Sequence, residues 1–192
     1  MNTLYDQINA FDGRKAKSEK ELQAMFHDIA EVALYGGYFL VNNTVKIYPV
    51  DIEFYFYGER PEDLVKTPWM CDYNMYHRGN KDEVPYFPLM SFNPHSSGVD
   101  FTFENEKEEY RASFLIRSHR YVDDDTDEVF DQPTVLRENL FGYTTCLGKN
   151  LFIEWKKEPE CGPHPIKKDV RWNFHDKSGA QDLKLWRFIK DK

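Results

Sequence analysis

Residues 50–57 alternate strictly between apolar and polar side chains, which is the pattern of a β-strand with two different faces. Successive residues of a strand point to opposite sides, so each face carries every second residue. The predicted apolar face consists of Val50, Ile52, Phe54 and Phe56. The predicted polar face carries two carboxylates and two phenols, from Asp51, Glu53, Tyr55 and Tyr57. We therefore predict a strand whose apolar face packs on a core and whose polar face is displayed in a fixed geometry.

A capping box predicts an amphipathic helix upstream of this strand. Ser18 stands at the N-cap and Glu21 follows three residues later, the spacing at which two such residues cap each other's backbone N–H groups. Apolar residues then recur every three or four positions, which predicts a helix of about 17 residues. They are Leu22, Met25, Phe26, Ile29, Ala30, Ala33 and Leu34. We expect Gly36 and Gly37 to end this helix by adopting positive φ angles.

Further alternating or apolar runs predict a sheet of several strands. The expected strands cover residues 38–41, 45–48, 50–57, 98–103, 112–118, 151–155 and 185–189, and a short helix covers 133–141. Strands outnumber helices and most connections are short, which favours a single α+β domain over residues 1–192, built on a curved antiparallel sheet with a few helices. We expect residues 1–17 to form a flexible N-terminal arm, and the long segment 58–98 to form functional loops.

The net charge is negative and unevenly distributed along the chain. The whole sequence has 25 Lys and Arg against 33 Asp and Glu, a net charge of -8. Residues 155–192 contain ten basic and six acidic side chains, so residues 1–154 carry a net charge of -12. Five of the acidic residues lie in the run 123–128, which we expect to be a solvated loop. This charge argues against indiscriminate nucleic-acid binding.

The composition and the residue spacings limit the expected cellular compartment and the expected metal and cofactor content of the protein. The three cysteines are an odd number and lie far apart, so no disulfide framework is expected and a reducing compartment is favoured. No segment has the apolar length of a signal sequence or of a membrane span. The six histidines match no metal-binding spacing, and no phosphate-binding loop occurs. We expect a monomeric, cytoplasmic protein with no membrane partner, no metal and no cofactor.

Two features indicate where chemistry could occur. Asp51 and Glu53 could act as a general base and its orienting partner if their strand face is partly buried, although such faces are as often simply exposed to water. Arg117 follows an apolar run, so its guanidinium needs a carboxylate partner near a buried edge. Glu53, Asp51 or Asp100 could provide that partner, in a structural ion pair or in an active site.

Several segments, in collinear order along the chain, resemble the alkyladenine (3-methyladenine) DNA glycosylase family. Val-Asp-Ile-Glu-Phe-Tyr at 50–55 resembles the family's Val-Glu-Thr-Glu-Ala-Tyr signature, and Phe-Leu-Ile-Arg at 114–117 resembles its Leu-Leu-Arg. The other similar segments are 29–41, 58–63, 76–79, 92–100 and 185–189. The resemblance extends over residues 22–190 and implies an antiparallel sheet domain with a helix and long loops around a base-binding pocket.

The resemblance also implies roles for individual residues. Its catalytic residues would be Glu53, which activates water, and Arg117, which helps to hold that water. Its base-binding residues would be Tyr55, His77, Asp100 and Asp51. Its DNA-contacting residues would be Phe92, as an intercalating wedge, and His95. The implied activity is that of a monofunctional DNA N-glycosylase, a base excision repair hydrolase that flips an alkylated purine out of DNA and hydrolyses its N-glycosidic bond.

Departures from the family pattern leave two other functions open. Residues 133–136, which would contact phosphate in the family, contain no Lys, and residues 1–154 carry a net charge of -12. Because DNA affinity depends on phosphate contacts, this charge disfavours duplex binding. One alternative is a hydrolase or lyase that acts on a small nucleoside-like ligand in the same pocket. The other is a binding protein that keeps the fold without catalysis.

Overall fold

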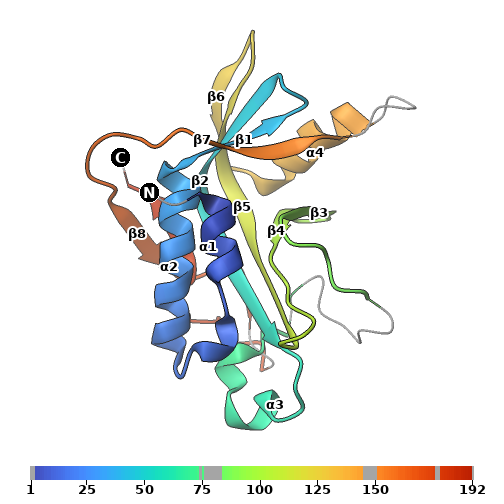
Figure 1. Cartoon of the computed structure of the whole chain (residues 1–192), viewed down its shortest axis with the longest axis vertical. Helices are drawn as coiled ribbons and strands as arrows, with labels where there is room; N and C mark the ends of the chain where they lie inside the picture. The colour runs from blue at the N-terminus through green and yellow to red at the C-terminus, as the bar shows by residue number, and fades with distance from the viewer. Residues whose placement is uncertain (1–2, 74, 76–83, 145–150, 176–177, 192) are drawn as a thin grey trace.

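The computed structural model describes residues 3–73, 75, 84–144, 151–175 and 178–191. Within them the chain forms an α+β fold with a curled antiparallel sheet and a few helices (Figure 1). The helices are α1 (Leu4–Ala10), α2 (Glu19–Tyr35), α3 (Asp63–Lys66) and α4 (Pro133–Thr144), with 3-10 turns η1 (Gly13–Lys15) and η2 (Pro68–Met70). The strands are β1 (Gly37–Val41), β2 (Val45–Gly58), β3 (Ser91–His95), β4 (Gly98–Thr102), β5 (Tyr110–Val122), β6 (Asp127–Phe130), β7 (Ile153–Lys157), β8 (Ile166–Asp169) and β9 (Arg187–Lys190).

Strands β2 and β5 form the centre of the sheet. They pair with each other in antiparallel fashion, and β4 and β3 continue the sheet beyond β5. The other edge of β2 is shared by β1 along its first part and by β9 along its second part. In Figure 1 the central strands run through the middle of the molecule, with α1 and α2 side by side on one side of them. None of the described helices is both long and apolar enough to cross a membrane.

The core lies between the α1–α2 layer and the apolar face of the sheet, and aromatic rings fill much of it. Phe26 of α2 stacks on Phe54 of β2 with ring centroids 4.5 Å apart, and Phe101 of β4 stacks on Phe114 of β5 at 4.9 Å. The fully buried ring of Trp186 meets Phe26 edge-on at 5.2 Å. Burial of this much aromatic surface holds the sheet against the helices, and it leaves the opposite sheet face to other residues.

Helix α2 confirms the prediction made from its cap and its apolar spacing. Ser18 Oγ accepts a hydrogen bond from the Glu21 N–H at 3.3 Å, and the Glu21 carboxylate accepts one from the N–H just before Ser18 at 2.8 Å. The expected positive φ angles are wrong, because Gly36 has a φ of -90° and Gly37 begins β1. Glycine is needed at position 37 for space, since a Cβ there would stand 2.0 Å from a carbonyl oxygen of β7.

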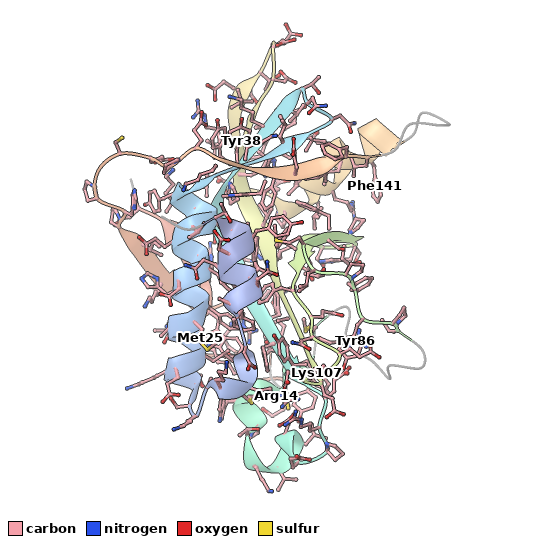
Figure 2. The ribbon with its side chains drawn as sticks, viewed as in Figure 1. Arg14, Met25, Tyr38, Tyr86, Lys107 and Phe141 are labelled. Atoms are coloured by element: carbon pink, nitrogen blue, oxygen red, sulfur yellow. The ribbon has the colours of Figure 1, made fainter. Side chains whose placement is uncertain are left out.

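The N-terminal residues pack against the domain, whereas we predicted a flexible arm over 1–17. Leu4 and Ile8 stand one helical turn apart on α1 and are buried against the core. Arg14 in η1 forms an ion pair with Asp63 of α3 and donates a hydrogen bond from Nε to the Glu108 carbonyl at 2.7 Å (Figure 2). These contacts tie the segment to both a helix and the β4–β5 connection.

Strand β2 runs unbroken through Pro49, where we predicted a boundary between two strands. Its pairing with β5 becomes irregular there, because Val50 of β2 and Arg117 of β5 are each left without a directly opposed residue. Ile47 faces the core before this double bulge and Ile52 faces it afterwards, so the alternation changes phase. Val50, predicted on the apolar face, lies in the bulge and is half-buried. Such bulges redirect side chains locally and increase the twist of a strand.

The structure adds three short strands, β3, β6 and β8, in segments that we predicted to be loops. Each pairs with a single neighbour and therefore lies at an edge of the sheet. Edge position explains why β3 tolerates Pro94, which has no N–H to donate to a further strand. Strand β6 takes up the end of the acidic run, and Asp124 and Asp125 at the hairpin turn before it are exposed, as the charge pattern predicts.

Candidate functional site

Three neighbouring strands place polar residues in one row on the sheet face opposite the core. Leu115 of β5 is paired with Glu53 of β2 on one side and with Asp100 of β4 on the other. Paired residues of adjacent strands point to the same face, so the two carboxylates share it. Tyr55 follows Glu53 by two residues on β2, and Arg117 follows Leu115 by two residues on β5. Period-two spacing puts both on the same face as the carboxylates.

A cavity of about 470 Å³ lies over this row. This volume is typical of small-molecule sites, which measure about 300–1,000 Å³. The sheet forms its floor, and its walls come from residues 95–97 at the end of β3, from the first residues of α4 and from residues 172–174. Its aromatic lining residues are Tyr55, Trp172 and Phe174, and its ionisable ones include His95, Asp100 and Arg117. Four of the residues predicted from the sequence therefore line one cavity.

Glu53, the predicted water-activating base, lies beneath the cavity and has no exposed surface. Its Oε2 accepts hydrogen bonds from the Tyr55 hydroxyl at 2.9 Å and from Arg117 Nη1 at 3.3 Å. Its Oε1 accepts one from the Trp172 N–H at 2.6 Å. Burial raises the pKa of Glu53, and the charge of Arg117 and these hydrogen bonds offset part of that rise. Because all three donors belong to lining residues, Glu53 fixes the position of the cavity walls.

Arg117 lies in the double bulge of the β2–β5 pair. As the unopposed residue of β5 it reaches the cavity with a side chain that is 16% exposed. Its carboxylate partner is Glu53, among the three that the sequence allowed. Next to this pair, burial and the charge of Glu53 raise the pKa of Tyr55 well above its usual value. The phenol therefore stays protonated and serves as a hydrogen-bond donor to Glu53.

His95 and Asp100 bring an imidazole and a carboxylate together at the cavity wall. His95 Nε2 lies 3.2 Å from Asp100 Oδ1, and both side chains are more than nine-tenths buried. The Ser113 hydroxyl donates a longer hydrogen bond of 3.5 Å to the other oxygen of Asp100. The two atoms are at ion-pair distance but do not have hydrogen-bond geometry. An imidazole and a carboxylate are the side-chain types most often used in general acid–base chemistry. Residues that the resemblance assigned separately, to a base edge and to DNA, thus form one pair.

Two of the predicted residues that the structure describes, Asp51 and Phe92, do not line the cavity. Asp51 binds Arg187 of β9 through both carboxylate oxygens, at 3.1 and 2.6 Å, and so holds β9 on β2. Phe92 packs edge-on against the core residue Phe101 at 5.4 Å, because it lies on the core side of β3. His77 lies outside the described residues.

The segment 171–174 supplies lining residues that we did not predict. It lies in a polar connection, and its one local signal is the run Arg-Trp-Asn-Phe, which sets two aromatic residues beside an Arg. Arg171 is fully buried and donates hydrogen bonds to both oxygens of Asp72 at 2.6 and 3.0 Å. Its guanidinium also lies 3.9 Å from the ring centroid of Phe174. This buried ion pair anchors one wall of the cavity to the segment that follows β2.

The cavity combines apolar planes with a few charged groups. The rings of Tyr55 and Phe174 lie 5.3 Å apart and form one apolar wall. The formally charged lining side chains in the described part of the chain are Arg117 and Asp100, one of each sign. Such a site can hold a planar ring by its faces and recognise its edge with donors and acceptors. Among the described residues, no group of three or more His, Cys, Asp and Glu side chains is placed to hold a metal ion.

Known proteins assign no role to this site. No protein-family model, no curated protein and no solved structure matches the chain.

Proposed function

We propose that the cavity binds a planar, nitrogen-rich ring carried by a small nucleoside-like molecule. One observation carries this proposal: the aromatic side chains Tyr55, Phe174 and Trp172 converge with Arg117 and Asp100 around a cavity of about 470 Å³. Aromatic planes contact the faces of a flat heterocycle. Arg offers only donors and an ionised Asp only acceptors, so together they suit a ring whose edge presents both kinds of group.

The charge distribution favours a small ligand over duplex DNA. The lining charges of Arg117 and Asp100 balance each other, whereas residues 1–154 as a whole carry a net charge of -12. Duplex DNA is bound mainly through many Lys and Arg contacts to phosphates, and its affinity suffers when these are few. A nucleoside needs no such contacts, because its binding comes from the cavity alone.

The His95–Asp100 pair would let the cavity act on such a ligand as well as bind it. The corresponding reaction is hydrolysis of the N-glycosidic bond: water adds to the sugar carbon, the carbon–nitrogen bond breaks, and the ring leaves with a proton. Asp100 lines the cavity and would accept the proton of that water, and the His95–Asp100 pair would then pass this proton to the nitrogen of the leaving ring; Glu53 has no exposed surface. In this reaction Glu53 acts as a positioning residue.

A DNA N-glycosylase is the second candidate, and one observation favours it. The resemblance to alkyladenine glycosylases assigns Glu53, Tyr55 and Arg117 to catalysis and stacking, and Tyr55 and Arg117 each donate a hydrogen bond to Glu53, at 2.9 and 3.3 Å. An extruded base would occupy the same cavity as a free nucleoside. The two candidate functions differ in one requirement: a glycosylase must also bind the rest of the DNA outside the cavity, whereas a nucleoside-binding protein need not.

Titration calorimetry with the full chain distinguishes the two candidate functions by the affinity for each class of ligand. The ligands are adenosine, guanosine, uridine, cytidine, their free bases, and single- and double-stranded oligonucleotides with and without an alkylated purine. We expect saturable binding of a nucleoside or base and weaker binding of the oligonucleotides. Arg117→Gln and Asp100→Asn should each weaken binding about tenfold or more, because each removes a charged hydrogen-bonding group. Arg120→Gln breaks an exposed ion pair with Asp127 and should leave binding unchanged.

Mass spectrometry of the same mixtures distinguishes turnover from binding. Release of the free base from a nucleoside supports hydrolysis, and its loss in Asp100→Asn would assign the carboxylate. Base release from alkylated oligonucleotides, together with tight oligonucleotide binding, would favour the glycosylase instead. If no nucleoside, base or oligonucleotide gives heat or raises the melting temperature, both candidates fail.

A further inference from the structure

Trp172 is the most exposed of the four tryptophans, and it lines the cavity. It is 65% exposed, whereas Trp186 is fully buried and Trp69 and Trp155 are half-buried. A large ring left in water contributes little burial to folding, so the core gives no reason for a tryptophan at this position. The position of Trp172 at the cavity therefore suggests a role in contacting a ligand.

The backbone under this exposed ring is held from both sides. The Trp172 N–H donates to the buried Glu53 carboxylate at 2.6 Å. The preceding Arg171 is fully buried and bonds to Asp72 and to the Phe54 carbonyl, the latter at 3.1 Å. The following residue, Asn173, has a φ of +53°, a left-handed conformation that Asn tolerates better than most residues. An exposed ring therefore stands on a firmly anchored support, which is the arrangement of a preorganised contact surface.

The indole also lies near the cation of the cavity. The Arg117 Cζ is 5.8 Å from the centroid of the Trp172 ring. Within the described part of the chain the Arg117 guanidinium has one hydrogen bond, to Glu53, so most of its five N–H donors remain available to a ligand. A ring bound at the edge by Arg117 would lie close to the face of the indole.

We infer that Trp172 is the stacking residue of this site: its indole covers the face of the bound ring and makes the cavity select planar ligands over non-planar ones. This inference deepens the proposed function and rests on it, because it assigns to one residue the selection for a flat heterocycle. Stacking of a base on an aromatic side chain changes affinity roughly 5- to 150-fold.

The test uses three variants and a matched pair of probes. Trp172→Leu keeps an apolar side chain but removes the ring, Trp172→Phe keeps a smaller ring, and Val65→Ala removes apolar surface from an 81% exposed position on α3 as the control. Uridine and 5,6-dihydrouridine share the sugar and the hydrogen-bonding edge but differ in the planarity of the ring. Adenosine and guanosine report the affinity for larger flat rings. Calorimetry gives the affinities, and melting temperatures show whether each variant folds.

We expect Trp172→Leu to bind the best of these nucleosides at least about fivefold more weakly than the wild type, with Trp172→Phe in between and Val65→Ala unchanged. The preference for the planar ring should shrink in Trp172→Leu at an unchanged melting temperature, which a purely structural role would not produce. Nucleoside binding should also quench tryptophan emission, and Trp172→Phe should remove that quenching.

Two outcomes separate failure of this inference from failure of the proposed function. If the wild type binds a nucleoside and folded Trp172→Leu binds it equally well, the stacking role is overturned and the proposed function stands. If the wild type binds none of the nucleosides or bases, the proposed function fails and the inference fails with it.

Discussion

Acid should destabilise this protein through His119 of β5. The side chain is fully buried, and neither ring nitrogen has a hydrogen-bond partner among the described residues. Its closest ring contact is the apolar Phe130 of β6, with centroids 5.6 Å apart. Burial lowers the pKa of His119 to about 4, from the ordinary value of 6.5. The folded protein therefore keeps the imidazole neutral at a pH where an exposed histidine is already charged.

The size of the effect follows from these two pKa values. As the pH falls below 6.5 the unfolded chain takes up a proton on His119, whereas the folded protein does so only near pH 4. Stability is therefore fully present above pH 6.5 and is lost progressively between pH 6.5 and 4. The difference of about 2.5 in pKa corresponds to about 3 kcal/mol of unfolding free energy. Other groups add their own pH dependence, so the contribution of His119 has to be read as a difference between variants.

His119→Phe replaces the imidazole with a ring of similar shape that does not titrate. We expect urea unfolding, followed by circular dichroism between pH 7 and 4, to show a fall in unfolding free energy that is smaller than the wild-type fall by about 3 kcal/mol. The variant should also be more stable at pH 7, because two buried nitrogens without partners are removed. Phe130→Leu, which alters the packing around His119 and leaves it in place, serves as the control. The same pH dependence in His119→Phe as in the wild type would refute the reasoning.

Three further stability changes follow from contacts described above. Asp72→Ala removes one of the two carboxylates that pair with the buried Arg171 and leaves Asp182, at 3.0 Å, as the other; it should destabilise the protein by about 3 kcal/mol, measured by urea unfolding. Gly37→Ala places a methyl group against a carbonyl of β7 and should lower stability by about 1–3 kcal/mol, seen as a lower melting temperature than that of the wild type. Ser18→Ala removes the cap of α2 and should cost about 1 kcal/mol; an unchanged denaturation midpoint would show that the cap contributes nothing.

Local sequence patterns were sufficient to predict the parts of the fold that depend on residues close together in the sequence. The cap and apolar spacing of α2 predict its length, and the alternation after Val50 puts Glu53 and Tyr55 on one face of β2. The apolar run before Arg117 indicates that its cation needs a carboxylate, which Glu53 provides across the β2–β5 pair. In each case the information lies within a few residues or within one strand pairing.

Long-range contacts explain what the sequence could not predict. Glu53 accepts a hydrogen bond from the N–H of Trp172, a residue 119 positions further along the chain. Strand periodicity alone does not predict that Glu53 has no exposed surface. The ion pair of Asp51 could not be predicted either. The sequence places Asp51 on the polar face of β2, but only the pairing of β9 with β2 brings Arg187 into contact with it. The burial of His119 is a further example. It is paired with Phe130 of the edge strand β6, and the sequence around His119 does not predict this pairing.

The two unopposed residues at the centre of the sheet act as matched insertions. If Val50 and Arg117 were deleted together, the residue pairs on either side would join in one continuous register, with Asp51 still opposite Ser118. The core-facing alternation, which now changes phase at this point, would become continuous, because each strand loses one residue at the same level. The cation of the cavity thus stands at an inserted position of the sheet, outside the regular pairing of β2 and β5, while its charge pairs with the buried Glu53.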